Sequence, residues 1–207
     1  MDRLIKPQIV LPKVASFNSG GGAWPLKPHS TENWAWYKGA FEDHELDTII
    51  EIGKRTDIQR GATVGNGDLA VRNSFVSFIF PNEYTGWIFD RMASVINSVN
   101  DQFFGFDLSA MEQGLQFTKY SAPGEHYTWH IDKGIGNRKL SVSLQLSDPK
   151  QYKGGNLEMQ FGGKPEKAAR ERGMMTFFPS YALHRVTPVT QGTRYSLVCW
   201  ISGPPFK

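Results

Sequence analysis

The sequence predicts a mainly β protein with flanking helices, built as an antiparallel sandwich or small barrel. After residue 105 the chain breaks into short apolar runs that glycine, proline, asparagine and aspartate separate. Runs of this length and spacing are typical of antiparallel sheets. Before residue 105, two longer segments carry apolar residues at helical spacing instead. The expected strands are residues 115–120, 126–132, 140–146, 156–161, 174–178 and 194–201.

The composition is that of an ordinary globular protein. A chain of 207 residues with 40% hydrophobic and 13% aromatic residues can fill a sizeable core. The formal charge of +3 is too small to indicate a nucleic-acid partner, although it suits an anionic small ligand. We therefore expect no nucleic acid among the partners.

The cysteine count limits the possible metal ligands, and the apolar runs limit where the protein can be located. Cys199 is the single cysteine, so an internal disulfide and a thiolate cluster are excluded, and any metal must use nitrogen and oxygen ligands. The apolar run at residues 9–11 is too short for a signal peptide and is stopped by Pro12. No apolar stretch is long enough to span a membrane. We expect a soluble, cytoplasmic protein without a membrane partner, and the oligomeric state stays open.

The first half of the chain supplies the supporting elements. Residues 1–33 are rich in proline and glycine, which favours an extended N-terminal arm. Residues 40–55 predict an amphipathic helix with acidic residues in its first turn, residues 74–80 a buried strand, and residues 84–104 a second helix. We expect one domain over residues 34–207, with helical support at 40–104 and a β core at 105–204.

A glycine-rich segment lies between the first helix and the buried strand. Residues 61–73 include Gly61, Gly65 and Gly67, and their apolar periodicity fades. A loop of this length is often functional, but an ordinary surface loop fits the same pattern. Both interpretations stay open on the sequence alone.

The motif His130-Ile131-Asp132 predicts half of a metal site. On a strand, His130 and Asp132 leave the same face, roughly 6–7 Å apart along the chain. The pair alone could arise by chance, and it needs a third ligand, for which His184 is the candidate. Two histidines and one carboxylate with open positions suit non-haem Fe(II). His126 is a rival, but roughly 13 Å of strand separates it from His130, so we expect a rim or packed histidine.

The last expected strand carries a candidate carboxylate clamp. Arg194, Ser196 and Trp200 share one face, and a planar guanidinium beside a hydroxyl suits a carboxylate. A 2-oxo acid could bind the metal through its 2-oxo group and C1 carboxylate while its far carboxylate binds Arg194. Residues 140–146 alternate apolar with polar residues, so their polar face could line a wet cavity. There Ser143 and Gln145 either contact the co-substrate or are simply polar strand positions.

Five segments in this order resemble the 2-oxoglutarate and Fe(II)-dependent dioxygenases. The likeness covers residues 34–204 and is greatest to the prolyl 4-hydroxylase-like branch, which includes the PKHD-type hydroxylases of bacteria and phages. It implies a double-stranded β-helix, a jelly-roll barrel of the cupin kind with helices outside. The segments are YSAPGEHYTWHID (120–132), RKLSVSLQLS (138–147), GGNLE (154–158), FP (178–179) and HRVTPVTQGTRYS (184–196).

The resemblance also implies roles for the site residues. It makes His130, Asp132 and His184 the iron ligands, Arg194 with Ser196 the partner of the C5 carboxylate of 2-oxoglutarate, and Tyr120 a hydroxyl donor to that co-substrate. Ascorbate is a further candidate cofactor.

This chain departs from the family's pattern in three places. Arg194 stands where animal and algal prolyl 4-hydroxylases usually carry lysine, which keeps the charge. The spacing from Tyr120 to His130 is one residue longer than in the prolyl hydroxylase pattern, so Tyr127 is the alternative to Tyr120. Trp200 stands where nucleic-acid demethylases carry a second arginine, which counts against nucleic-acid repair.

The substrate contacts follow from the same likeness. In the family the loop comparable to residues 61–73 often closes over substrate, which makes Arg72 the preferred contact, with Tyr127 and Trp200 as further candidates. The implied reaction hydroxylates an unactivated C–H bond with O2 while 2-oxoglutarate becomes succinate. We expect a prolyl or other residue of a peptide or protein as substrate. The alternatives are a free amino acid or small metabolite and, third, a non-catalytic cupin-type metal-binding module.

Overall fold

The computed structural model describes residues 31–61, 68–132 and 136–205. The chain divides into two compact units, Met1–Thr31 and Glu32–Lys207. The arm expected at residues 1–33 therefore lies almost wholly outside the described residues, as do residues 62–67 of the glycine-rich segment. The domain boundary at residue 34 stays a prediction.

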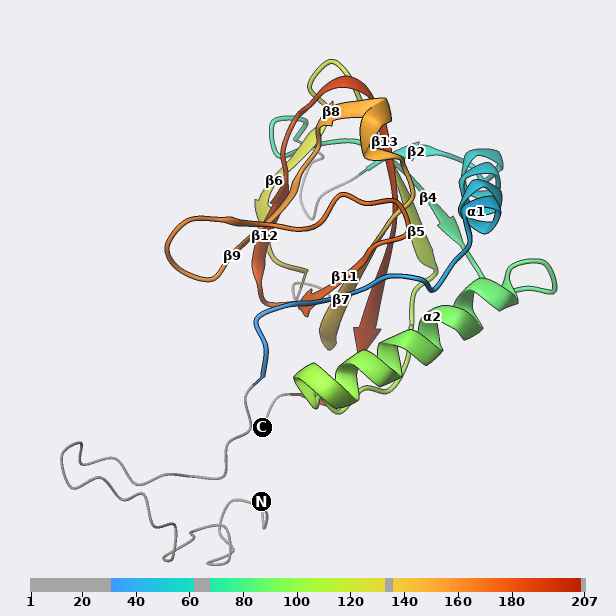
Figure 1. Ribbon diagram of the computed structural model, residues 1–207, viewed down its shortest axis with the longest axis vertical. Helices are drawn as coiled ribbons and strands as arrows, with labels where there is room; N and C mark the ends of the chain where they lie inside the picture. The colour runs from blue at the N-terminus through green and yellow to red at the C-terminus, as the bar shows by residue number, and fades with distance from the viewer. Residues whose placement is uncertain (1–30, 62–67, 133–135, 206–207) are drawn as a thin grey trace, which may run out of the picture. The chain divides into compact units, whose positions relative to one another are not determined.

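Two antiparallel sheets form the body of the second unit (Figure 1). The larger sheet has the order β1-β11-β7-β13-β5-β4-β2, with β8 paired to β13, and the smaller has the order β10-β9-β12-β6-β3. The strands of the larger sheet are β1 (Ala35–Tyr37), β2 (Gln59–Arg60), β4 (Phe75–Ile79), β5 (Leu115–Ser121), β7 (Arg138–Gln145), β8 (Tyr152–Gly154), β11 (Met175–Pro179) and β13 (Val189–Ser202). Those of the smaller sheet are β3 (Arg72–Asn73), β6 (His126–His130), β9 (Leu157–Gln160), β10 (Glu166–Lys167) and β12 (Leu183–Val186).

The alternation on β7 separates the core from the space between the sheets. Leu140, Val142 and Leu144 are fully buried in the main hydrophobic core. Ser143 and Gln145 point the other way, toward the smaller sheet, because successive side chains leave opposite faces of a strand. The sequence-based expectation of one apolar and one polar face is confirmed.

Two helices cover the outer face of the larger sheet (Figure 1). The helix α1 (Asp43–Arg55) begins at a capping box in which Glu42 and Glu45 satisfy each other's backbone N–H groups. The helix α2 (Gly86–Val99) continues into one π-helical turn, η2 (Asn100–Phe104). Their apolar faces join the same core, so both predicted helices are confirmed.

Several short strands escaped prediction. The strand β12 is four residues long, and its pattern shows no clear alternation in the sequence. It forms because it pairs with β6 on one side and β9 on the other. Strands this short depend on tertiary pairing, which local propensity does not encode.

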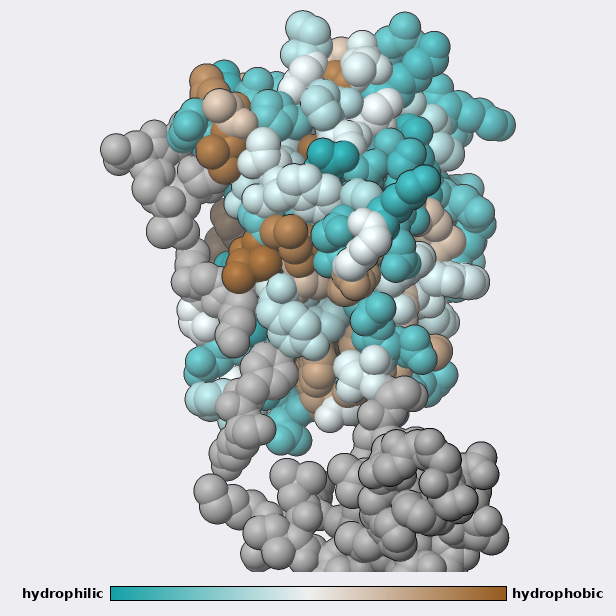
Figure 2. Space-filling model, turned by 90° about the vertical axis from the view of Figure 1, so that its left-hand side faces the viewer, coloured by the Kyte–Doolittle hydropathy of each residue, from teal (hydrophilic) through white to brown (hydrophobic). Residues whose placement is uncertain are grey.

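The outward face of the smaller sheet is mostly hydrophilic. Figure 2 views this side of the molecule, and its described surface is largely teal with small groups of brown side chains. On β12, Arg185 points outward and pairs with Glu158 at 2.7 Å, whereas His184 is buried. On β12, Leu183 and Arg185 thus lie on the outward side, and His184 lies on the side that faces the larger sheet.

No helix among the described residues is long and apolar enough to cross a membrane.

A glycine in α1 sets how closely that helix approaches the sheet. A Cβ added at Gly53 would lie 2.3 Å from Cγ of Phe117, a ring that is fully buried on β5. We expect Gly53→Ala to lower the free energy of unfolding by about 1–2 kcal/mol, because overpacking outweighs the gain in helix propensity.

Gly86 at the start of α2 is the matched control, since an added Cβ there meets nothing within 4 Å. Gly86→Ala should leave the stability unchanged or slightly higher. Urea unfolding followed by circular dichroism compares the two variants, and equal stabilities would contradict the close packing of Gly53.

Candidate functional site

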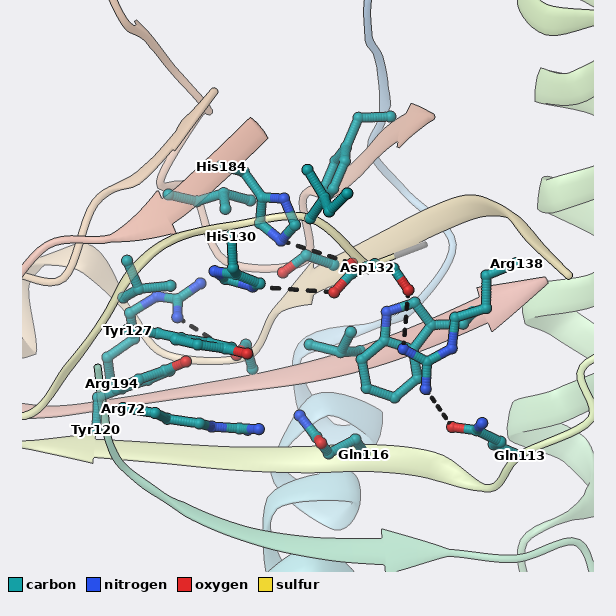
Figure 3. Close-up of a pocket in the computed structure, with 18 of the residues that line it drawn as sticks. Arg72, Gln113, Gln116, Tyr120, Tyr127, His130, Asp132, Arg138, His184 and Arg194 are labelled. Atoms are coloured by element: carbon teal, nitrogen blue, oxygen red, sulfur yellow. Dashed lines mark hydrogen bonds and ion pairs between the residues drawn. The ribbon is translucent and has the colours of Figure 1, made fainter. Parts of the chain in front are cut away.

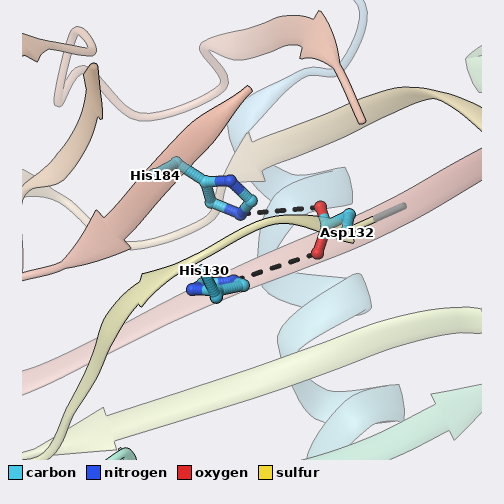
Figure 4. A group of neighbouring side chains, drawn as sticks. All are labelled: His130, Asp132 and His184. Carbon is cyan, nitrogen blue, oxygen red and sulfur yellow. Dashed lines mark ion pairs between the residues drawn. The ribbon is translucent and has the colours of Figure 1, made fainter. Parts of the chain in front are cut away.

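Three side chains from the smaller sheet converge between the two sheets. His130 ends β6, Asp132 follows two residues later, and His184 on β12 is the direct register partner of His130. One ligand atom from each of the three lies within 4.8 Å of the others. The Asp132 carboxylate oxygens lie 3.5 Å from His184 Nε2 and 3.8 Å from His130 Nε2 (Figure 4).

Asp132 does not reach this cluster in the way the sequence suggested. The strand was expected to run through residue 132, but β6 ends at His130 and the chain turns. The Asp132 N–H donates to the Ser180 carbonyl at 2.9 Å, and Ser141 Oγ donates to Asp132 Oδ2 at 2.7 Å. The turn and these two bonds, rather than strand alternation, position the carboxylate.

The backbone orients both imidazoles. His130 Nδ1 lies 2.7 Å from the Thr128 carbonyl, and His184 Nδ1 lies 2.9 Å from the Ala182 carbonyl. A carbonyl can only accept, so each Nδ1 carries a proton, and in the neutral imidazole the lone pair is on Nε2. Both lone pairs are therefore available for a metal, in the arrangement usual for ligating histidines.

The electrostatics favour a neutral His130 beside an ionised carboxylate. Burial lowers the pKa of His130 to about 3, and the neighbouring His184 adds to this effect. Burial alone would raise the pKa of Asp132, but the two imidazoles and the Ser141 hydroxyl outweigh it and lower this pKa. A set of two neutral nitrogens and one carboxylate fits Fe(II) with open positions.

Arg194 lies deep in the same space, on β13. Its side chain is 3% exposed, with Nε donating to Gln145 Oε1 at 3.1 Å and Nη1 donating to Ser196 Oγ at 3.4 Å. Neither partner is charged. A buried guanidinium with only neutral partners is a strong site for a carboxylate, because charge-assisted bidentate bonds would offset its burial.

A chain of hydrogen bonds behind Arg194 holds it in place. Gln145 Nε2 donates to the Tyr152 hydroxyl at 3.0 Å. Arg170 donates to the same hydroxyl from Nε at 3.4 Å and to the Tyr152 carbonyl from Nη2 at 3.1 Å. Gly155, whose φ is +60°, leaves room for the arginine, since a Cβ there would lie 3.1 Å from Arg194 Cδ.

The cluster and Arg194 line one cavity of about 300 Å³ between the sheets (Figure 3). Arg194, Ser196 and Trp200 all line it, as expected for alternate residues of one strand face. Cys199, between them, is buried in the core on the opposite face. This volume is at the small end for ligand sites.

The two candidate tyrosines take different positions in the cavity. Tyr120 is 4% exposed, and its ring centre is 5.7 Å from the Arg194 guanidinium carbon. Burial raises the pKa of Tyr120, so its hydroxyl stays protonated and able to donate. Tyr127 instead stacks on His130, with ring centres 3.4 Å apart. The role of Tyr120 as co-substrate donor stays a prediction, but its position beside Arg194 is compatible with it.

The remaining candidates divide into those in the cavity and those outside. Arg72 on β3 is buried, lines the cavity and lies 4.7 Å over the Tyr127 ring. His126 is not part of the histidine–aspartate cluster, and its ring nitrogens lie 2.8 Å and 3.1 Å from the Gly124 and Ala70 carbonyls. The proposed lid lies partly outside the described residues, so its closure stays a prediction.

Sequence reasoning assigned no role to several residues of the site. The signal for Ser141 was present in the polar face of residues 140–146, whereas the others come from loops or strand ends without a pattern of their own. They are Gln113, Gln116, Arg138 and Ser141, with Tyr152 and Arg170 behind Arg194.

Comparison with known proteins agrees with this geometry. Residues 115–202 match the 2OG-Fe(II) oxygenase superfamily. A PKHD-type hydroxylase of Klebsiella pneumoniae (strain 342) is 30% identical over 171 residues, covering 77% of this chain and 73% of the relative. A PKHD-type hydroxylase of Synechococcus sp. (strain CC9605) is 45% identical over 85 residues, covering 39% of this chain and 38% of that relative. The latter alignment thus spans well under half of either protein.

Two solved structures share the fold. A Pseudomonas putida prolyl-4-hydroxylase has a TM-score of 0.68 at 21% identity, covering 83% of this chain and 94% of that one. A prolyl hydroxylase from Trichoplax adhaerens, in complex with a peptide fragment of the hypoxia inducible factor oxygen degradation domain, has a TM-score of 0.71 at 17% identity. It covers 84% of each chain.

These likenesses confirm the predicted jelly-roll barrel and the predicted relationship. The fold, the matched segment and the long alignment with the Klebsiella relative agree with one another. The chain belongs to the 2OG-Fe(II) oxygenase superfamily, in its PKHD-type, prolyl 4-hydroxylase-like branch.

Proposed function

We propose that this protein is an Fe(II)- and 2-oxoglutarate-dependent dioxygenase that hydroxylates an unactivated C–H bond. One observation carries the proposal: the histidine–aspartate cluster lines a single cavity with Arg194, whose hydrogen-bond partners among the described residues are neutral. His130, Asp132 and His184 would hold the iron, and Arg194 with Ser196 would hold the distal carboxylate of 2-oxoglutarate.

The chemistry divides between the bound groups and the chain. Fe(II) and 2-oxoglutarate, when bound, supply O2 activation: 2-oxoglutarate loses CO2 to become succinate, which takes one oxygen atom, and the other enters the substrate C–H bond. The chain orients both imidazoles through backbone carbonyls, fixes the carboxylate through Ser141 and orients Arg194 through Gln145. Apolar side chains such as Leu157 and Phe178 line the cavity and limit water there.

We favour a prolyl or other residue of a peptide or protein as the substrate. The relationship to PKHD-type hydroxylases supports this, as does a structural neighbour described with a bound peptide fragment. The small cavity instead favours a free amino acid or metabolite as the second candidate. A non-catalytic module would be expected to lack part of the cluster or the clamp, and both are present. Ascorbate and the cytoplasmic location stay predictions.

The first test measures the metal and co-substrate together. Anaerobic titration with Fe(II) and 2-oxoglutarate should produce the weak visible charge-transfer band of the chelate. Replacing His130, Asp132 or His184 singly with alanine should abolish the band, because each removes one of three ligands. His126→Ala should retain it, and circular dichroism checks that every variant is folded. A wild-type protein without the band, and without succinate on admission of O2, would refute the proposal.

The second test concerns the bonds behind the clamp. Tyr152→Phe removes the hydroxyl that Gln145 contacts, so we expect roughly five- to tenfold weaker 2-oxoglutarate binding, the effect of losing one hydrogen bond. Fe(II) affinity should not change. Tyr195→Phe is the control, because Tyr195 stacks on Phe117 in the core and does not line the cavity. Calorimetry that finds both variants binding 2-oxoglutarate equally would count against this positioning.

The third test concerns Arg72. We expect Arg72→Ala to lower the ratio of hydroxylated product to succinate severalfold while 2-oxoglutarate affinity stays unchanged, because its guanidinium lies over the Tyr127 ring and extends from β3, whereas the clamp stands on β13 of the other sheet. Mass spectrometry of product and succinate from a proline-containing peptide measures this ratio. Arg60→Ala, an exposed arginine on β2, is the control. A loss of 2-oxoglutarate binding in Arg72→Ala would contradict a role in substrate contact.

A further inference from the structure

A pair of buried serines lies next to Asp132 but outside the lining of the cavity. Ser141 is on β7, and Ser180 follows β11 in the turn that leads to β12. Both residues are fully buried, at 0% exposure, and neither lines the cavity. The pair therefore contacts no ligand in the cavity directly, and it can act on one only through Asp132.

The hydrogen bonds of the pair run in one direction. The Ser141 hydroxyl donates to Asp132 Oδ2 at 2.7 Å, and an ionised carboxylate can only accept. A hydroxyl has a single proton, so Ser141 can only accept from the Ser180 hydroxyl, whose Oγ lies 2.9 Å away. Ser180 is therefore the donor, and the chain of bonds runs from Ser180 through Ser141 to the Asp132 carboxylate.

The backbone of Ser180 makes a second connection to Asp132. The Asp132 N–H donates to the Ser180 carbonyl at 2.9 Å, and the Ser180 N–H donates to the Lys139 carbonyl, also at 2.9 Å. These bonds replace the strand ladder, because β6 ends at His130 and Asp132 lies beyond it. One residue of the turn thus holds the backbone of Asp132 and, through Ser141, its side chain.

The same turn also orients a histidine of the cluster. The Ala182 N–H donates to the Pro179 carbonyl at 2.8 Å, and the Ala182 carbonyl lies 2.9 Å from His184 Nδ1. Residues 179–182 therefore hold Asp132 and aim the His184 imidazole at the same time. The distance of 3.5 Å between Asp132 Oδ2 and His184 Nε2 follows from the geometry of this turn.

The orientation of the Asp132 carboxylate decides whether the cluster can share a cation. Its Oδ2 faces His184 and its Oδ1 faces His130, as Figure 4 shows. Rotation of the carboxylate about its last bond would move both oxygens away from the imidazoles. A hydrogen bond to Oδ2 from a hydroxyl that is itself held by another restricts this rotation. Hydrogen bonds of this kind orient metal ligands and influence metal affinity.

We propose that Ser180 is a positioning residue of the metal centre, which acts through Ser141 to hold the Asp132 carboxylate in the orientation that binds the cation. The inference rests on the proposed function for the identity of that cation. It deepens the function by naming a residue that sets metal affinity without contacting the metal. A purely structural role would instead stabilise the fold with and without metal, and would leave the metal affinity unchanged.

The test measures the affinity of the full chain for Co(II), which is stable in air and reports its coordination in visible d–d bands. Ser180→Ala should bind Co(II) roughly tenfold more weakly, and Ser141→Ala roughly 10- to 100-fold more weakly, as is usual when partners of metal ligands are lost. The double variant should bind as weakly as Ser141→Ala alone, since Ser180 acts through Ser141. Calorimetry measures the affinities, and changed d–d bands should accompany each loss.

Ser77→Ala is the matched control. Ser77 is also a buried serine, 2% exposed, but its hydroxyl donates to the Gly53 carbonyl of α1 at 2.9 Å instead of facing the cluster. This variant should lose stability without any change in Co(II) affinity. Urea unfolding of the metal-free proteins, followed by circular dichroism, compares the stabilities. Ser180→Gly removes the same hydroxyl and replaces Ser180→Ala if that variant does not fold.

The outcomes distinguish the inference from the function on which it rests. Ser180→Ala with wild-type Co(II) affinity overturns the inference, as does a double variant whose loss is the product of the two single losses. An equal loss of affinity in Ser77→Ala overturns it too, because fold stability would then explain the loss. A wild-type protein that binds Co(II) but shows no charge-transfer band with Fe(II) and 2-oxoglutarate overturns the function and leaves the positioning role standing. A wild-type protein that does not bind Co(II) overturns both.

Discussion

The register between β6 and β12 is the constraint on which the site depends. It sets His184 directly opposite His130, so two imidazoles from distant parts of the chain share one point between the sheets. A slip by one residue would turn either histidine to the outer face, where Trp129 and Arg185 now pack together. The turn after His130 then adds Asp132, and backbone carbonyls on both Nδ1 atoms aim the free nitrogens inward. The pairing of β6 with β12 therefore brings the candidate ligands together.

The polar interior is stable because its members satisfy one another. Asp132 accepts from Ser141, Arg194 donates to Gln145, and Gln145 donates to Tyr152. Burying such groups without partners would cost several kcal/mol each, whereas a satisfied network mainly loses flexibility. The apolar face of β7 packs the core while its polar face joins this network. One strand thus serves stability and function at the same time.

The two ends of the cavity differ in how much the resemblance to the family says about them. Under the proposed function, the Arg194 end would bind 2-oxoglutarate, the co-substrate for which the family is named, so resemblance alone anticipates it. Arg138 and Trp200 line the other end of the cavity, and the co-substrate assigns no partner to that end.

The sequence by itself determined the local patterns. It predicted the helices α1 and α2, the two faces of β7, the shared face of Arg194 and Trp200, and the order of motifs that indicates the family. It did not predict β12, the turn that carries Asp132, or the Arg138 end of the cavity. Periodicity predicts which face of a helix or strand is apolar, but it does not predict which elements pair with one another. Which strands pair, and which side chains then meet across 50 residues or more, is decided only by tertiary packing.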